Sequence, residues 1–543
     1  MHPFHGARRI AGAALLLSLC ACSGGGSDDS KTSRQIDLST QAVSFAAESP
    51  AAQTPAAQVV TATFGPGLAN LAVIFNGNGV ESVTTDVTGN TAQITITPSA
   101  PPSLGGGIFT STVGVTGYFC ADAGCTRLEA GGSKTLSVSY QVSPTATTIG
   151  PNVAISGVSN TAIVRGAGFS GFTLQGVKFG DVAATETTLV SDNEIRVTYP
   201  ALAAGTYPVT VEVQNLAGSV PSTATLIAVD PVSYPAQTLA WPAAVSTVRS
   251  MIYDAQRSAL LVATDSGGGS IVRYPYVSGA WGAPSSVAIA NLRDMALSTD
   301  GSKLLAITTT QLVRVNPETL ATDAAIDAPS LASGTTLKSI AGLNLNSAII
   351  TTTAGNATSS LYGYAMSTNE LTQLSSALIS ATARSSADGS AVILIQGDPA
   401  TTAAQVVYAL NSSSTSIRST GISVNQNAIA PVLDRNATRM ILNGTLVYEF
   451  STLAGFGKLP ETTLAMTTRP DGARAYTYDS AAGTILTFDI SATKVGETYT
   501  PVGSAVTPAG APGDGVKMIA SPDGNALFLA GSSQIVIQPT PAS

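Results

Sequence analysis

The chain has almost no histidine. Of its 543 residues only His2 and His5 are histidines, and both lie in an N-terminal segment that we expect to be removed. An imidazole is required for Ser-His-Asp and Cys-His nucleophile activation and is a common zinc ligand. The mature chain therefore excludes these mechanisms, and we predict no catalytic residue, no metal site and no cofactor from its sequence.

Cysteine is equally scarce. Only Cys20, Cys22, Cys120 and Cys125 are present, and the first two lie near the N-terminus. The remaining pair is too small a ligand set for a typical metal site. In an oxidising compartment Cys120 and Cys125 should form a disulfide across a hairpin, whereas in a reducing one they would be free thiols.

Charge is also sparse, because Asp, Glu, Lys and Arg make up 11% of the residues and the net charge is −8. A nucleic-acid partner is not expected for a chain of this balance. Ala, Ser, Thr, Gly and Val dominate, and no long amphipathic helical period occurs. This composition is typical of an extracytoplasmic, all-β protein.

The N-terminus carries an export signal. Arg8 and Arg9 precede the apolar run 10–19, which is too short to span a bilayer permanently. The next residues, in Leu19-Cys20-Ala21-Cys22, resemble the lipobox of bacterial lipoproteins. That resemblance implies that Cys22 is lipidated and becomes the mature N-terminus. The alternative is ordinary secretion after cleavage at an alanine.

The residue after Cys22 indicates to which membrane the lipoprotein would be sent. In bacterial lipoproteins an Asp at this position favours retention in the inner membrane, and here the residue is Ser23. The resemblance therefore implies an outer membrane lipoprotein, facing either the periplasm or the cell surface. The Gly- and Ser-rich stretch that follows is typical of a flexible tether.

A short pattern recurs seven times in the second half of the chain. Each copy has an apolar strand, a polar turn and a second apolar strand, as in MALSTDGSKLLAIT from Met295. A spacing of 35 to 52 residues is typical of a β-propeller built from four-stranded blades. Equivalent positions are Met251, Met295, Ile340, Ala383, Pro431, Met466 and Met518.

The repeats also predict turns and a closure. Asp-Gly pairs at 300–301, 388–389, 471–472 and 523–524 suit tight hairpins, because glycine adopts a positive φ without a Cβ clash. The shortest repeat predicts a trimmed blade. Since the last blade has too few strands of its own, we expect residues 232–241 to complete it and remove an exposed edge.

Two smaller modules precede the propeller. Residues 35–143 alternate apolar and polar residues between Gly, Pro and Asn turns, which favours an immunoglobulin-like sandwich. Residues 144–230 resemble the IPT/TIG family, which implies a second immunoglobulin-like domain used as a spacer or interaction module. The matching features are Gly166-x-Gly168-Phe169, Phe179-Gly180, Ser191-Asp192-Asn193 before a strand ending at Pro200, and Gly205-Thr206-Tyr207.

The predicted fold is therefore all-β, with two immunoglobulin-like sandwiches followed by a seven-bladed β-propeller. The propeller repeats resemble the lactonase-like and quinoprotein-like propellers of exported bacterial proteins, a likeness that implies fold and not activity. The expected segments are a lipoprotein signal peptide (1–21), a tether (22–34), the first sandwich (35–143), the IPT/TIG domain (144–230) and the propeller (231–543).

Three cations form the candidate ligand site. Arg249, Arg293 and Lys338 stand in register where successive blades enter their innermost strands, with Arg384 and Lys517 nearby but out of register. They predict an anion-binding arc at the channel mouth, or else are solvated charges at strand ends. The loop residues Asp265, Asp398 and Asp479 are the carboxylates from which a metal or catalytic site could be built, or else are turn formers.

The functional prediction is a non-catalytic binding or scaffolding lipoprotein of the envelope. Its expected partners are the membrane, through the N-terminal lipid, and an acidic glycan or an envelope protein. A carboxylate- and metal-dependent propeller enzyme of the lactonase or lyase type is the first alternative, and a purely structural surface spacer is the second. Three or more carboxylates converging at the channel mouth would favour the enzyme.

Overall fold

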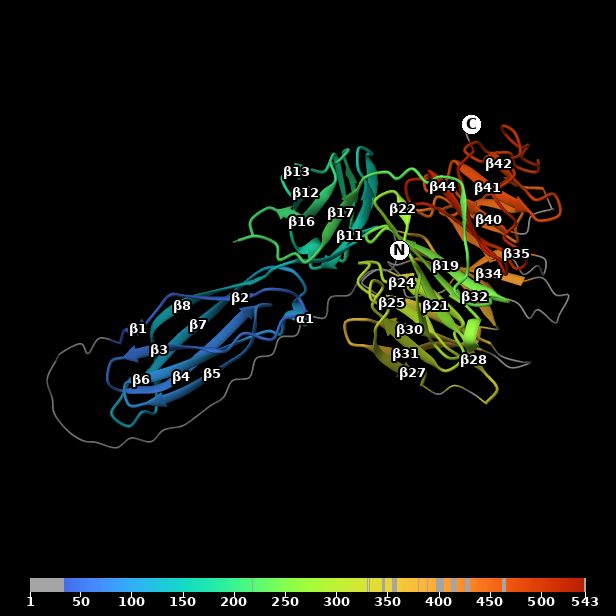
Figure 1. Cartoon of the computed structure of the whole chain (residues 1–543). Coiled ribbons are helices and arrows are strands. Elements are labelled where there is room, and N and C mark those ends of the chain that lie inside the picture. The colour runs from blue at the N-terminus through green and yellow to red at the C-terminus, as the bar shows by residue number, and fades with distance from the viewer. Residues whose placement is uncertain are drawn as a thin grey trace. The chain divides into compact units, whose positions relative to one another are not determined.

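A computed structural model describes residues 34–541. Residues 217, 330, 332, 344–346, 354–358, 379, 388, 397–404, 412–417, 425–429 and 461–464 are excepted. The described chain is almost entirely β-structure, as the sequence predicts (Figure 1). Its contacts define two compact units. One contains the described residues up to Thr145 with Ala167–Gln175 and Val213–Pro221, and the other contains the remainder.

The first immunoglobulin-like sandwich consists of two four-stranded sheets. Alternating side chains of strand β2 are buried, as a period of two requires when one face of a sheet covers a core. Phe45 and Tyr140 meet edge to face in that core. The sheets are β1 (Ile36–Leu38), β3 (Gln58–Phe64), β6 (Thr91–Pro98) and β5 (Val80–Thr88), and β2 (Ala42–Ala47), β8 (Leu128–Val142), β7 (Gly107–Cys120) and β4 (Leu68–Gly77).

The hairpin of β7 and β8 carries the predicted disulfide. Cys120 and Cys125 are bonded, which confirms that prediction. Asp122 stabilises the loop between them, since its carboxylate accepts hydrogen bonds from the hydroxyl and the backbone N–H of Thr126, at 2.7 and 2.8 Å. These bonds lower the pKa of Asp122, with that from the hydroxyl contributing most.

The IPT/TIG region forms a second sandwich. Inside it, Arg165 and Glu194 make a buried ion pair at 3.0 Å, and Phe179 packs edge to face against Tyr199. One sheet contains β10 (Val153–Ile155), β17 (Thr225–Val229), β16 (Gly205–Val213), β12 (Leu174–Phe179) and β13 (Val182–Ala183). The other contains β14 (Glu186–Ser191), β15 (Glu194–Tyr199), β11 (Asn160–Ala167) and β9 (Thr145–Gly150).

The propeller has seven sheets in the described part of the chain, each beginning at an innermost strand. The predicted strand positions of the Met295 repeat are confirmed. Blade 1 is β19 (Val248–Asp254), β20 (Ala259–Thr264), β21 (Ser270–Val277), β22 (Ala280–Trp281) and β23 (Ser285–Ala288). Blade 2 is β24 (Asp294–Leu297), β25 (Leu304–Ile307), β26 (Gln311–Val315) and β27 (Thr322–Asp327). Blade 3 is β28 (Thr336–Leu343), β29 (Ser347–Thr353), β30 (Ser359–Ala365) and β31 (Glu370–Leu378).

The later blades are less regular. Blade 5, the shortest repeat, keeps four strands but none exceeds four residues. Blade 4 is β32 (Ala381–Ser385), β33 (Ala391–Gln396), β34 (Gln405–Asn411) and β35 (Arg418–Val424). Blade 5 is β36 (Val432–Leu433), β37 (Arg439–Leu442), β38 (Leu446–Glu449) and β39 (Gly455–Lys458). Blade 6 is β40 (Ala465–Thr468), β41 (Arg474–Asp479) and β42 (Thr484–Asp489).

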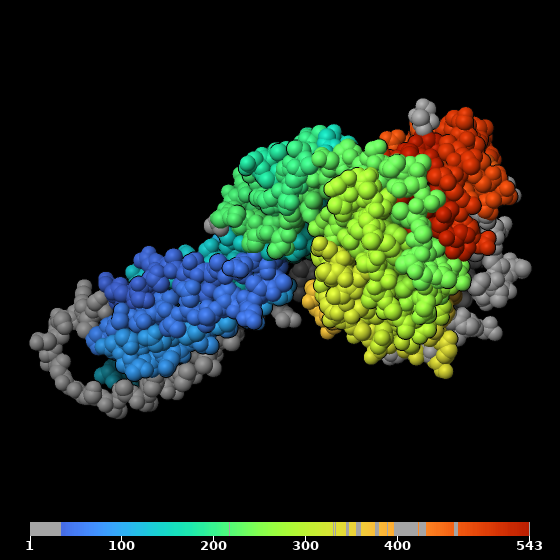
Figure 2. Space-filling view, in the orientation of Figure 1, coloured from blue at the N-terminus to red at the C-terminus, as the bar shows by residue number. Residues whose placement is uncertain are grey.

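Strand β18 (Gln237–Leu239) completes the last blade, as the sequence predicts. It pairs antiparallel with β45 (Ile535–Pro539), which continues to β44 (Ala526–Ala530) and β43 (Lys517–Ala520). In Figure 2 the green chain that precedes the first blade lies against the red C-terminal strands. The propeller is therefore closed by a strand from the opposite end of its own sequence.

An aromatic cluster supports this closure. The ring of Tyr234 lies 4.9 Å from that of Tyr276 and 5.5 Å from that of Phe528, and its hydroxyl bonds to Tyr253 at 2.6 Å. Trp241 donates its indole N–H to the carbonyl of Gly531 at 3.0 Å. Both the apolar and the polar parts of the closing segment are thus engaged with the first and last blades.

The Asp-Gly turns at 300–301 and 523–524 are built by a serine as well as by glycine. Gly301 and Gly524 have φ of +67° and +74°. The buried hydroxyl of Ser298 donates to Asp300 at 2.7 Å and accepts from the N–H of Lys303 at 2.9 Å. The hydroxyl of Ser521 likewise donates to Asp523 and accepts from the N–H of Asn525, so the innermost strands of blades 2 and 7 end in turns of the same kind.

Within the described residues, no helix has the length and apolar character needed to cross a membrane.

Candidate functional site

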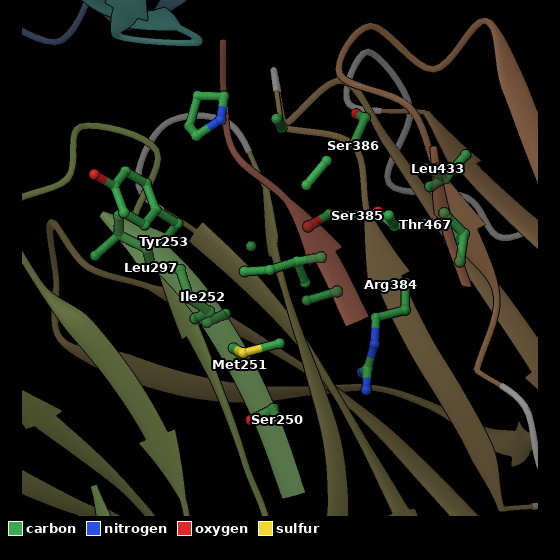
Figure 3. Close-up of a pocket in the computed structure, with 18 of the residues that line it drawn as sticks. Ser250, Met251, Ile252, Tyr253, Leu297, Arg384, Ser385, Ser386, Leu433 and Thr467 are labelled. Carbon is green, nitrogen blue, oxygen red and sulfur yellow. The ribbon is translucent and has the colours of Figure 1, made fainter. Parts of the chain in front are cut away.

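A cavity of about 530 Å³ lies inside the ring of innermost strands (Figure 3). All seven of these strands contribute to its wall, and it extends to the face formed by the turns that follow them. Representative turn residues at that face are Gln256, Gly301, Ala387, Pro470 and Pro522. A concave site of this volume is in the range that holds small-molecule ligands.

The repeat makes part of the wall apolar. Met251, Met295, Met466 and Met518, which occupy equivalent positions in four blades, all line the cavity, and Ile340 does so from a fifth. These five side chains are at most 7% exposed and belong mainly to the cores of the blades. The apolar surface that the cavity offers therefore comes from partly exposed lining residues such as Ile252, Leu297, Val432 and Ile519.

A buried carboxylate, Asp294, organises the inner wall. Its Oδ2 accepts hydrogen bonds from the hydroxyl of Ser339 at 2.9 Å and from the N–H of Ile340 at 3.2 Å. The same oxygen accepts from Nη1 of Arg384 at 3.0 Å, while Oδ1 accepts from the N–H of Met295 at 2.9 Å. Asp294 is thus fully engaged with the strands of blades 2, 3 and 4.

Arg384 is held by one nitrogen only. Its Nη1 donates to Asp294, to the hydroxyl of Ser339 at 3.1 Å and to the carbonyl of Ala383 at 2.7 Å. Its Nε and Nη2 form no hydrogen bond with any other described residue. Its side chain is 30% exposed, and Figure 3 shows it extending from its strand into the channel.

Two further cations line the wall without a partner in the described part of the chain. Nε of Arg249 is buried and unbonded, and Lys517 forms no ion pair or side-chain hydrogen bond with any described residue. Burial, assisted by the charge of Arg384, lowers the pKa of Lys517, while Asp294 acts in the opposite direction. Three cations therefore share the inner wall with one carboxylate.

Two charged side chains of the outer wall, by comparison, each have a partner in the protein. Asp254, the other carboxylate among the described lining residues, pairs with Arg257 at 2.8 Å. Arg435 donates from Nη2 to the carbonyl of Val153 at 2.7 Å. Because Val153 and its neighbours Pro151 and Asn152 also line the cavity, the IPT/TIG region forms part of its rim. Sequence patterns offered no signal for this contact.

The predicted cation arc is divided in the structure. Arg249 lies in the cavity wall, whereas Arg293 is exposed and Lys338 donates to the carbonyl and hydroxyl of Ser380 at 3.1 and 3.0 Å. Neither Arg293 nor Lys338 belongs to the wall as far as the structure describes it. The anion-binding role assigned to the three residues together stays a prediction. The structure instead groups Arg249 with Arg384 and Lys517.

The loop carboxylates form turns. Asp265 accepts from the N–H groups of Ser246 and Thr247, and Asp479 accepts from those of Ala481 and Ala482. Asp398 and Cys22 lie outside the described residues. Among the residues that are described, no group of three His, Cys, Asp or Glu side chains could hold a metal ion.

Comparison with known proteins identifies one domain. Residues 144–227 match the IPT/TIG domain family, which confirms the resemblance in that region. No curated protein sequence matches the chain. Similar solved structures include U3-55K and the WD40 repeats of RRP9, each with a TM-score of 0.41 and 11% identity over 57% of this chain, covering 99% and 98% of those chains. A likeness at this level carries no functional argument.

Proposed function

We propose that this protein is an exported, lipid-anchored binding or scaffolding protein whose propeller cavity receives a ligand or part of a partner. The cavity carries the proposal, because it combines an apolar surface with cations that have no partner among the described residues. An IPT/TIG domain followed by a propeller fits a binding or scaffolding role. The two sandwich domains would then serve as supports between the anchor and the cavity.

The proposed cellular location is the outer membrane. It is supported by the residues around Cys22, by Ser23 after it and by the Gly-rich segment that follows. A disulfide at Cys120 and Cys125 agrees with an oxidising compartment. In this setting the expected partners are an acidic glycan or an envelope protein, together with the membrane that holds the lipid.

The anchor is tested by changing Cys22 to Ser in the full-length protein. The change should abolish acyl labelling and either release a soluble protein or leave the precursor unprocessed. The matched control is Cys20→Ser, which should leave labelling intact because Cys20 precedes the cleavage site. Unchanged labelling and membrane fractionation of the Cys22→Ser protein would contradict the anchor without bearing on ligand binding.

The binding role is tested by a screen of acidic glycans and envelope proteins at low salt. Binding to the cation arc should weaken as salt rises, and changing Arg249 and Arg293 together to Ala should weaken it further. Folding should survive, because Arg293 is exposed and Arg249 has no side-chain partner in the described chain. Glycan binding that ignores both salt and the double change would remove the arc from the proposal.

A further inference from the structure

The inner wall of the propeller channel has hydrogen-bond donors left over. Asp294 fixes Nη1 of Arg384, so the position of this guanidinium is set while its Nε and Nη2 remain available. These two nitrogens form the side-on edge of a guanidinium, which binds a carboxylate through two parallel hydrogen bonds. A prepositioned fork of this kind loses little side-chain entropy when an anion binds.

Lys517 and Arg249 extend the donor set. Their innermost strands, β43 and β19, belong to the last and the first blade, which the closing strand joins. The Asp294 carboxylate cannot also accept hydrogen bonds from Lys517 and Arg249. Its two oxygens already accept four hydrogen bonds, from Ser339, Ile340, Met295 and Arg384. Cations left without a counterion in a partly buried wall cost stability, and an anion would offset that cost.

The apolar part of the wall limits what the anion is attached to. Partly exposed apolar side chains, among them Ile252, Leu297, Val432 and Ile519, line the cavity together with these cations. A fully polar ligand would leave this apolar surface in contact with water, whereas an apolar group would cover it. A cavity of about 530 Å³ is in the range that holds a small molecule.

The geometry points to a binding site in the channel for a small organic anion, with its anionic head at Arg249, Arg384 and Lys517 and a compact apolar body against the partly exposed apolar side chains of the wall. This inference rests on the proposed binding function and specifies its ligand class. It differs from the predicted cation arc, because Arg384 and Lys517 replace Arg293 and Lys338.

A matched series of small molecules tests the inference on the full-length protein by calorimetry. The probes are 4-phenylbutyrate, 4-phenylbutyl phosphate, 4-phenylbutanol and acetate. The carboxylate or phosphate with a phenyl body should bind at least about tenfold more tightly than the alcohol, because bonds to charged groups contribute most. Both should also bind more tightly than acetate, which has no apolar body. The two phenyl-bearing anions distinguish a carboxylate from a phosphate ligand.

Arg249→Gln and Lys517→Met are the informative variants. Each should weaken the binding of 4-phenylbutyrate by about tenfold and leave that of 4-phenylbutanol nearly unchanged. Neither residue has a side-chain partner among the described residues, so the fold should be retained. Arg384→Gln is less suitable as a primary variant because it would leave the buried Asp294 without its cation. Lys458→Met is the matched control for Lys517→Met, since it removes an exposed cation outside the wall and should leave the binding of 4-phenylbutyrate unchanged.

The outcomes separate this inference from the function on which it rests. Equal binding of the anions and the alcohol, or binding of 4-phenylbutyrate that both wall variants leave unchanged, would overturn the anion site. Glycan or protein binding that persists in those variants would still support the proposed binding role. Failure of all four probes to bind would overturn the channel site and leave the glycan screen as the test of the wider function.

Discussion

The closure of the propeller and the inner wall of its channel differ in how most of their buried polar groups are bonded. At the closure, the hydroxyls of Tyr234, Tyr274 and Tyr276 donate to Tyr253, Ala240 and Ser233 respectively, inside an aromatic cluster. In the channel, Arg249 and Lys517 have no partner in the described chain. One region uses burial to stabilise the fold, whereas the other retains a cost that an anion would relieve. Stability and binding should therefore respond separately to substitutions in the two regions.

Removing the closing strand should have the largest effect. A propeller fragment beginning at residue 246 lacks β18 and Tyr234, so the edge of β45 is exposed and the ring is open. It should lose cooperative thermal unfolding, whereas a fragment beginning at residue 231 should keep it. Calorimetry of the two fragments makes the measurement, and equal transitions would show that β18 does not hold the ring closed.

A single substitution in the aromatic cluster should destabilise the propeller less than removal of the closing strand does. Tyr234→Ala removes a side chain that is 3% exposed and packed against both terminal blades, and should lower the free energy of unfolding by about 3–5 kcal/mol. Tyr234→Phe, which keeps the ring, should cost only about 1 kcal/mol. Urea denaturation distinguishes them. Similar losses from both changes would place the effect in the hydroxyl and not in the packing.

The disulfide lies in neither region and provides a control for both. Its cysteines are five positions apart, so breaking it by Cys120→Ser with Cys125→Ser should destabilise the first sandwich by about 2 kcal/mol, according to the loop-entropy argument. Its transition should move to lower denaturant concentration while that of the propeller and the binding of 4-phenylbutyrate stay unchanged. A shift of the propeller transition would mean that the two units unfold together.

Lys517→Met should have the smallest effect on the free energy of unfolding, which it should raise and not lower. Burial lowers the pKa of Lys517 in the folded protein, so the folded state binds this proton less tightly than the unfolded state does. The associated cost is fully present at neutral pH and declines as the pH rises through the lowered pKa. The substitution should therefore stabilise the free protein by about 1 kcal/mol at neutral pH and by less at alkaline pH. A loss of stability would indicate that Lys517 has a structural role.

The repeat predicted the architecture because it reflects the hydrogen-bonding and packing needs of every blade. The Met295 copy locates β24 and β25, and the segment 232–241, predicted to complete the last blade, contains β18. The Asp-Gly pairs predict turns because a backbone conformation with positive φ selects glycine locally. These features depend on near neighbours in the sequence or on a period, so a single sequence contains them.

The cavity wall was harder to predict because side-chain direction depends on irregularities in the strands. The pairing of β19 with β20 shifts between Val248 and Ser250, and that of β28 with β29 shifts between Leu337 and Ser339. An extra residue in a strand reverses the alternation of faces, so Arg249 and Lys338 cannot be placed by counting. Lys517 is noted in the sequence but left out of the predicted arc, although it is a cation directly before Met518 where the first three blades have Ser250, Asp294 and Ser339.

The closing strand also sets the order in which the propeller can fold. Trp241 and its partner Gly531 are 290 residues apart, so the contact cannot form until nearly the whole chain is available. Contacts of such long sequence separation form slowly, because a large loop must close first. In a chain that is synthesised from its N-terminus, β18 is available before all seven blades and pairs with the last of them. The ring, and with it the channel wall shared by blades 1 and 7, is therefore completed only when the last blade has folded.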